Sequence, residues 1–150
     1  MTFPDKKYAT VADLADDYFG HYAQAAGSVD RTRLAEAAAM LDAAYAGGAM
    51  VYVCGNGGSA AISNHLTCDH LKGAQTDTDL KPRVVSLAAT LETITAIAND
   101  ISYDDVYSEQ LKNLMDPGDL VIAVSGSGNS ENVVRAIRYA NEAGGVTLAI

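Results

Sequence analysis

The fold class of this chain is decided by residues 49–59, which read Ala-Met-Val-Tyr-Val-Cys-Gly-Asn-Gly-Gly-Ser. A short, continuous apolar run that ends in glycine is typical of a strand buried on both faces. The pattern returns at residues 120–130, Leu-Val-Ile-Ala-Val-Ser-Gly-Ser-Gly-Asn-Ser. Two further apolar runs, at 83–88 and 146–150, predict two more strands.

Helical spacing of apolar residues fills the intervals between these strands. The spacing predicts helices over residues 59–71, 91–98 and 130–143, and another that Asp104 or Asp105 caps and that runs to about Met115. Apolar strands that alternate with helices indicate a parallel sheet. We therefore predict an α/β fold, a three-layer sandwich with helices on both faces of the sheet.

Two more helices are predicted before the first strand, over residues 11–26 and 31–46, with Asp30 as the N-cap of the second. We expect residues 1–48 to form a helical segment that packs on the domain or between subunits, and residues 49–150 to form the α/β domain. The last strand ends at Ile150, the last residue. Because a native domain rarely stops at an uncovered central strand, we expect the fold to continue past this point.

Composition narrows the class of protein. The chain has 150 residues and a net charge of −9, which disfavours binding to nucleic acid. Two cysteines, Cys54 and Cys68, are too few for a disulfide framework. The N-terminus lacks a secretory pattern and no apolar run approaches the roughly 20 residues of a membrane span. We expect a cytoplasmic protein without a membrane partner.

Two glycine-rich segments carry the candidate chemistry: the first glycine loop, residues 55–59, and the second glycine loop, residues 125–130. Each is predicted to join a strand to a helix, where unpaired backbone N–H groups and the helix dipole favour an anion. We predict that four hydroxyls surround one phosphate: those of Ser59, Ser125, Ser127 and Ser130. Since the chain is acidic and neither loop contains Lys or Arg, binding must rely on N–H groups and hydroxyls.

The alternative for each loop is a plain turn with a helix cap, and Ser130 before Glu131 has the pattern of an ordinary helix start. No Gly-Lys-Ser/Thr is present, and the spacing Gly-x-Gly-x-x-Gly is absent at the first strand. The sequence therefore does not imply a nucleotide cofactor.

The chain from about Val51 to Ile150 resembles the SIS (sugar isomerase) domain family, within it the phosphoheptose isomerase group. Three motifs carry the resemblance: residues 54–59, Cys-Gly-Asn-Gly-Gly-Ser; residues 98–100, Ala-Asn-Asp; and residues 125–130, Ser-Gly-Ser-Gly-Asn-Ser. The resemblance implies a phosphorylated sugar as ligand and a homotetramer. It also implies isomerisation of sedoheptulose 7-phosphate to a mannoheptose 7-phosphate.

The resemblance also implies roles for individual residues. Those placed at the substrate are Asn56, Gly57, Gly58 and Ser59. Those that hold the phosphate are Ser125, Gly126, Ser127 and Ser130. Asn99 and Asp100 are placed at the sugar hydroxyls, and the alternative for these two residues is a loop turn with an Asx cap.

His65 and Asp69 are four residues apart on the helix predicted after the first loop, so they share a face. Both side chains are ligand types that Zn²⁺ accepts. The resemblance gives Asp69 the role of catalytic base and gives both residues a metal role. Relatives carry Glu where this chain has Asp69, and take a Gln and a His from further along the chain. The alternative is a polar pair on the helix surface.

Three functions stay open at this point. The first is an aldose–ketose isomerase that works through an enediol, with Asp69 as base. The second is a non-catalytic member of the family, either a sensor of sugar phosphates or a factor that binds a replication initiator. The third is an isomerase of another phosphosugar, because the loops recognise phosphate more than sugar length.

Overall fold

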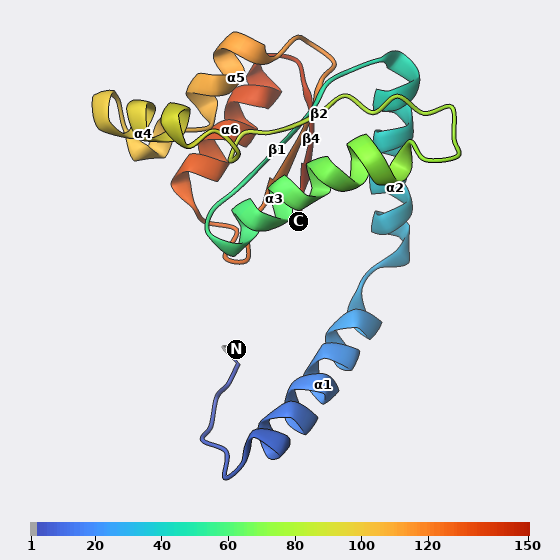
Figure 1. Cartoon of the computed structure of the whole chain (residues 1–150), viewed down its shortest axis with the longest axis vertical. Coiled ribbons are helices and arrows are strands. Elements are labelled where there is room, and N and C mark those ends of the chain that lie inside the picture. The colour runs from blue at the N-terminus through green and yellow to red at the C-terminus, as the bar shows by residue number, and fades with distance from the viewer. Residues whose placement is uncertain (1–2) are drawn as a thin grey trace. The chain divides into compact units, whose positions relative to one another are not determined.

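The computed structural model describes residues 3–150 (Figure 1). The chain divides into two compact units, the first ending at Glu36 and the second spanning Ala37–Ile150. Among residues 3–150, none of the helices combines the length and the apolar composition that crossing a membrane requires.

The first unit is built around α1 (Val11–Ser28). The helix starts at a capping box, in which the Asp13 N–H donates to Thr10 Oγ1 at 3.1 Å and the Asp13 carboxylate accepts from the Thr10 N–H. Aromatic and aliphatic side chains of this unit stay exposed, among them Val11, Phe19 and Tyr22. The following helix, α2 (Arg31–Gly47), starts as predicted at Asp30, whose carboxylate accepts the Thr32 N–H at 2.8 Å.

The second unit contains the four predicted strands, β1 (Val51–Gly55), β2 (Val84–Ser86), β3 (Leu120–Val124) and β4 (Val146–Ala149). They form one sheet in the order β2-β1-β3-β4, and every neighbouring pair is parallel. The predicted parallel α/β fold is therefore confirmed. The central strands β1 and β3 are buried along their whole length.

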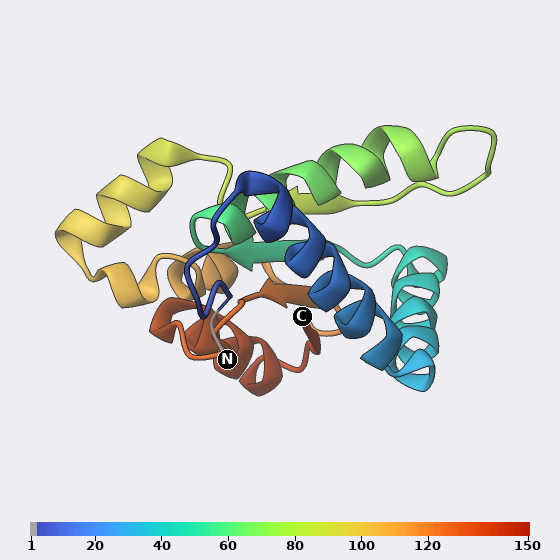
Figure 2. The ribbon, with the colours of Figure 1, turned by 90° about the horizontal axis from the view of Figure 1, so that it is seen from below.

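Helices cover both faces of the sheet. The segments that follow β1 and β2 are α3 (Gly58–Cys68), the π-helix η1 (Asp69–Ala74), α4 (Leu91–Asp100), the 3₁₀ turn η2 (Tyr103–Asp105) and α5 (Ser108–Leu114). The helix α6 (Glu131–Glu142) connects β3 to β4. Figure 2 shows the strands as a layer between α3 on one side and α5 and α6 on the other.

Two apolar clusters form the core, one on each face. On one face Tyr52 and Val121 pack against Leu111 of α5 and Ala136 of α6. The cluster on the other face includes Val53, Ile122, Leu66 of α3 and, from the C-terminal part of α2, Leu41 and Ala44. Alternate residues of β1 and β3 thus face opposite layers, which explains why these two strands are buried along their whole length.

One predicted helix changes type along its length, and one predicted helix cap was wrong. The helix after the first glycine loop is α-helical only to Cys68 and continues as a π-helix from Asp69. Neither Asp104 nor Asp105 caps the next helix, because both lie in η2, whose cap is Ser102. The Asp105 carboxylate instead pairs with Arg135 of α6, so a tertiary ion pair takes the group that the local pattern had assigned to a cap.

Candidate functional site

The two glycine loops start next to each other, at the carboxyl ends of adjacent strands. Gly55, the last residue of β1, is in register with Val124, the last residue of β3. A Cβ on Gly55 would lie 2.7 Å from both Ser59 Cβ and the Val124 carbonyl oxygen, so only glycine fits there. Gly57 has φ of +55°, a conformation that glycine adopts without strain. Glycine therefore serves both the close approach and the turn.

Asn56 of the first loop is held by protein groups. Its Nδ2 donates to Asn132 Oδ1 at 2.8 Å, and Asn132 Nδ2 donates back to Asn56 Oδ1 at 2.9 Å. Asn132 lies in the first turn of α6 and is 2% exposed. The two amides thus form a reciprocal pair that joins the first loop to the helix that follows the second loop.

Two tyrosines complete this arrangement. The Tyr107 hydroxyl donates to the Gly55 carbonyl oxygen and lies 3.1 Å from Asn56 Oδ1, while the Tyr103 hydroxyl donates to the same Asn56 oxygen at 3.2 Å. Burial raises the pKa of Tyr107 to about 12, with smaller contributions from Cys54 and Tyr103. The phenol therefore stays protonated at neutral pH, and its proton serves the Gly55 carbonyl group.

The second glycine loop is held mainly by its own backbone. The Ser125 hydroxyl oxygen accepts the Gly128 N–H at 3.1 Å, and the Ser127 hydroxyl oxygen accepts the Asn129 N–H at 3.2 Å. Gly128 has φ of +67°, which allows the loop to turn. Within residues 3–150 neither hydroxyl donates a hydrogen bond, so the proton of each is available to a ligand.

The start of α6 leaves donors without partners. Ser130 occupies the N-cap position, yet its side chain makes no cap hydrogen bond. In the part of the chain that the structure describes, the N–H groups of Gly126, Ser127 and Ser130 meet no protein acceptor. Ser130 therefore stands at the start of the helix by position, as the alternative had it, but its side chain does not cap the helix. Uncommitted N–H groups at a helix N-terminus form a site that suits an anion.

The serines of the two loops and their surroundings differ in burial. Ser59 and Ser130 are partly buried, whereas Gly126 and Ser127 are exposed. A cavity of about 290 Å³ lies beside the second loop. Its lining is mostly apolar and consists of Ala123, Ser125, Gly128, Val133, Val134, Ile137, Ala149 and Ile150.

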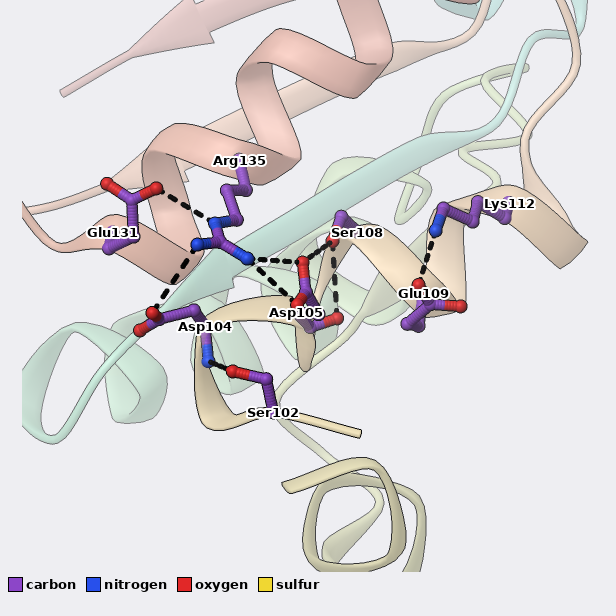
Figure 3. A network of polar contacts seen from close by, with 8 residues as sticks. All are labelled: Ser102, Asp104, Asp105, Ser108, Glu109, Lys112, Glu131 and Arg135. Atoms are coloured by element: carbon purple, nitrogen blue, oxygen red, sulfur yellow. Dashed lines mark hydrogen bonds and ion pairs between the residues drawn. The ribbon is translucent and has the colours of Figure 1, made fainter. Parts of the chain in front are cut away.

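Arg135, the arginine of α6 that is nearer in sequence to the second glycine loop, forms ion pairs with carboxylates. Arg135 donates to Glu131 at 2.8 Å and to both Asp105 oxygens at 2.9 and 3.0 Å, and it lies 3.5 Å from Asp104 (Figure 3). The hydrogen bond to Glu131, and to a smaller extent that to Asp105, raises the pKa of the Arg135 guanidinium above its ordinary value. Arg135 thus ties α6 to η2, and its charge is balanced by three carboxylates.

His65 and Asp69 face each other on the surface of α3 and η1. His65 Nε2 lies 3.5 Å from Asp69 Oδ1, and the two side chains are 76% and 63% exposed. They line a shallow hollow of about 530 Å³ with Ala61, Ile62 and Leu66. Residues 3–150 contain no group of three or more His, Cys, Asp or Glu side chains placed to hold a metal together. The pair could therefore contribute two ligands of a tetrahedral zinc site and does not complete one.

Asp69 is also remote from the glycine loops of its own chain. Ser59 lies in the first turn of α3 and Asp69 follows ten residues later. At about 1.5 Å per residue, the two positions are about 15 Å apart along the helix. The structure thus brings the two loops together and leaves the predicted base outside them.

Asn99 and Asp100 are exposed at the end of α4, where the Asn99 amide donates to the Asp100 carboxylate at 2.6 Å. They are the last residues of a helix, so the loop turn that was the alternative for them is absent from this position. The chain then returns to the first loop within three residues, because Tyr103 contacts Asn56.

The sequence analysis missed Asn132, Tyr103 and Tyr107. One signal for Asn132 was present, because it stands four residues before Ala136 and eight before Ala140 on the buried stripe of α6. A polar side chain on such a stripe requires a hydrogen-bond partner. Its partner, Asn56, is 76 residues away in the chain, so no local pattern identifies it.

Comparisons with known proteins agree with this architecture. A family model described as SIS domain matches residues 17–150. The phosphoheptose isomerase of Shewanella piezotolerans is 42% identical over 107 residues, which are 71% of this chain and 54% of that protein. The one of Shewanella oneidensis is 41% identical over the same shares. The chain thus spans about half the length of these curated relatives.

Two solved structures are similar over most of the chain. The phosphoheptose isomerase from Neisseria gonorrhoeae is 29% identical, with a TM-score of 0.82 over 93% of this chain and 74% of that one. The one from Francisella tularensis is 27% identical, with a TM-score of 0.86 over the same shares. From the matched family model, the parallel sheet and the paired loops together, we conclude that the chain belongs to the SIS domain family.

Proposed function

We propose that this protein binds the phosphate of a sugar phosphate between its two glycine loops and isomerises sedoheptulose 7-phosphate to a mannoheptose 7-phosphate. The observation that carries the proposal is the pairing of the loops at adjacent strand ends, with unpaired N–H groups at the start of α6. The chain has a net charge of −9, and the charge of Arg135 is balanced by Asp105 and Glu131. The phosphate must therefore be bound by uncharged donors, which are the backbone N–H groups and the hydroxyls of the loops. The names of the similar proteins support the choice of substrate.

The chemistry of an aldose–ketose isomerase is the movement of a proton between adjacent carbons. A base removes the proton from the carbon next to the carbonyl group while the carbonyl oxygen gains a proton, which gives an enediol. The base then returns its proton to the neighbouring carbon, and the other hydroxyl group loses its proton to become the new carbonyl group. We assign the role of base to Asp69. A base must come within about 3 Å of the proton that it removes, and Asp69 is about 15 Å along the helix from Ser59. The proposal therefore includes a homo-oligomer in which Asp69 serves the loops of a second copy.

An exposed apolar surface in the first unit supports the proposal of an oligomer. An apolar hollow of about 250 Å³ is lined there by Phe3, Val11, Leu14, Ala15, Tyr18 and Phe19. Exposed apolar surface of this kind is usual at contacts between proteins. We propose a tetramer, as the family resemblance implies, and a cytoplasmic location that matches the low cysteine content.

We also propose that His65 and Asp69 provide two ligands for Zn²⁺, which would supply Lewis-acid stabilisation of the enediol oxygens. Zinc content of the purified protein, measured by elemental analysis for the native chain and for His65→Ala, tests this assignment. Equal zinc in both proteins would exclude His65 as a ligand.

The function is tested by turnover of sedoheptulose 7-phosphate. We expect Asp69→Asn to be inactive and Ser130→Ala to lose about tenfold in kcat/KM through weaker phosphate binding. A mixed oligomer of the two variants should exceed both at low substrate concentration, because one copy supplies the intact base and the other the intact loop. Asp42→Asn, an exposed acid on α2, serves as the control. Full activity of Asp69→Asn would remove this residue from the mechanism.

A second candidate function is favoured by one observation, the distance between Asp69 and the loops of its own chain. A protein that binds a sugar phosphate without converting it, such as a sensor, needs only the loops. A native protein that is stabilised by sedoheptulose 7-phosphate in thermal unfolding but shows no turnover would favour this function over the isomerase. Turnover of a different phosphosugar would instead change the substrate and keep the reaction.

A further inference from the structure

The first glycine loop is joined in one hydrogen-bonded network to the segments that follow the other two sequence motifs. Asn56 comes from the first glycine loop, Asn132 from the helix that follows the second, and Tyr103 and Tyr107 from the segment after Asn99 and Asp100. The contacts among them span 47 to 76 residues of sequence. The network is therefore a tertiary connection between motifs and not a feature of either loop.

A count of the hydrogen bonds that the Asn56 side chain can make shows which of its donors and acceptors remain for a ligand. Its Oδ1 has two lone pairs and accepts from Asn132 Nδ2 at 2.9 Å and Tyr103 OH at 3.2 Å. Its Nδ2 has two protons, and one of them is donated to Asn132 Oδ1 at 2.8 Å. At most one proton of the Asn56 amide is thus left for a ligand, and the rest of the side chain is used to hold the loop in place.

Because Asn132 is buried, the position of Asn56 in which the two amides are hydrogen-bonded is favoured over positions in which they are apart. Asn132 is 2% exposed and its Oδ1 also accepts the Val133 N–H at 3.0 Å. If Asn56 moved away, the buried amide of Asn132 would lose its partner, which is costly. The burial of Asn132 therefore penalises any displacement of the first loop relative to α6.

We propose that Asn132 is a positioning residue for the anion site: acting through Asn56, it holds the first glycine loop at a fixed distance from the start of α6, so that the donors of both loops converge on one phosphate. This inference rests on the proposed phosphate site and deepens it. Neither Asn132 nor its amide pair needs to touch the ligand.

Two measurements test the proposal, and the first needs no ligand. We expect Asn132→Ala to increase hydrogen–deuterium exchange of the amides in residues 55–59 by about tenfold, the coupling typical of groups in one network. Asn141→Ala, an exposed asparagine near the other end of the same helix, should leave this exchange unchanged. Unchanged exchange in Asn132→Ala would overturn the proposal whatever the protein binds. Should Asn132→Ala fail to fold, Asn132→Ser provides the same comparison with a hydroxyl left in the site.

The second measurement is a double-mutant cycle on the dissociation constants of inorganic phosphate and sedoheptulose 7-phosphate. We expect Asn132→Ala to weaken binding of both ligands about tenfold in the native background and less than about twofold when Asn56→Ala is already present. An equal loss in both backgrounds would show that Asn132 does not act through Asn56 and would overturn the proposal. If the native protein binds neither ligand, the proposed function fails, while the exchange measurement still decides whether Asn132 positions the loop.

Discussion

The two glycine loops have similar compositions and opposite kinds of support. The first loop is held by distant parts of the chain: Gly55 lies against Val124, and Asn56 is bonded to Asn132 and Tyr103. The second loop is held mainly within itself, since Ser125 and Ser127 accept N–H groups three and two residues onward. Its one backbone bond to a distant residue runs from the Ser125 N–H to the Ile150 carbonyl oxygen at 2.9 Å. The difference indicates that the first loop has a fixed position, whereas the donors of the second loop can adjust to a ligand.

The largest effect is expected where the first loop touches β3. Gly55→Ala would place a Cβ 2.7 Å from a backbone oxygen that cannot move alone, so we expect a loss of about 3 kcal/mol in the free energy of unfolding. Gly126→Ala in the second loop is the matched control, because a Cβ there meets nothing within 4 Å. Chemical denaturation measures both. Equal losses would contradict the contrast between the loops.

A smaller effect is expected in the second loop, on binding and not on stability. Ser130 caps nothing, so Ser130→Ala should change the free energy of unfolding by less than about 0.5 kcal/mol and should weaken phosphate binding about tenfold. Ser102→Ala is the converse control, because Ser102 does accept the Asp104 N–H at 3.1 Å. That variant should lose about 1 kcal/mol of stability and bind phosphate normally. Unchanged phosphate binding in Ser130→Ala would return this residue to the status of a plain helix start.

The support of the first loop should also depend on pH. An unfolded tyrosine loses its proton near pH 10, whereas the pKa of Tyr107 in the folded protein is about 12. The folded pKa is the higher one, so this contribution to stability is complete below about pH 10 and is lost as pH rises towards 12.

The variant Tyr107→Phe separates the two roles of that hydroxyl. It should lose about 1 kcal/mol at pH 7, because the Gly55 carbonyl group loses its donor, and should then decline less steeply with pH above 10. Tyr22→Phe, exposed on α1, should behave as the native protein at both pH values. A native pH dependence in Tyr107→Phe would assign the alkaline loss to other groups.

The smallest effect is expected at Arg135, which holds the N-terminal part of α6 to η2 through partly exposed ion pairs (Figure 3). We expect Arg135→Ala to lower the melting temperature modestly at low salt and by less at high salt, since screening weakens such pairs. Arg138→Ala, an exposed arginine one turn further along, is the control. A loss of phosphate affinity larger than that of Ser130→Ala would show that Arg135 takes part in binding.

Much of the fold follows from local pattern in this chain. The strand at Val51–Gly55 and the strand at Leu120–Val124 are apolar throughout because both faces are covered, and that makes them easy to recognise. The π-helical continuation at Asp69 was not predictable, because π-helices are rare and a single short segment leaves no clear apolar pattern of its own. The helix cap predicted at Asp104 or Asp105 was wrong, because the Asp105 carboxylate pairs with Arg135, which is 30 residues away in the chain.

The sequence by itself determined the sheet, the order of its helices and the two glycine loops, because strand burial, helix spacing and glycine turns are properties of neighbouring residues. Only the tertiary structure decided what each loop does with its polar groups. It joined Asn56 to Asn132, left the donors around Ser130 free and placed Asp69 far from the loops of its own chain. The physical reason is that hydrogen bonds and distances between such residues depend on how the chain folds back on itself, and composition records none of them.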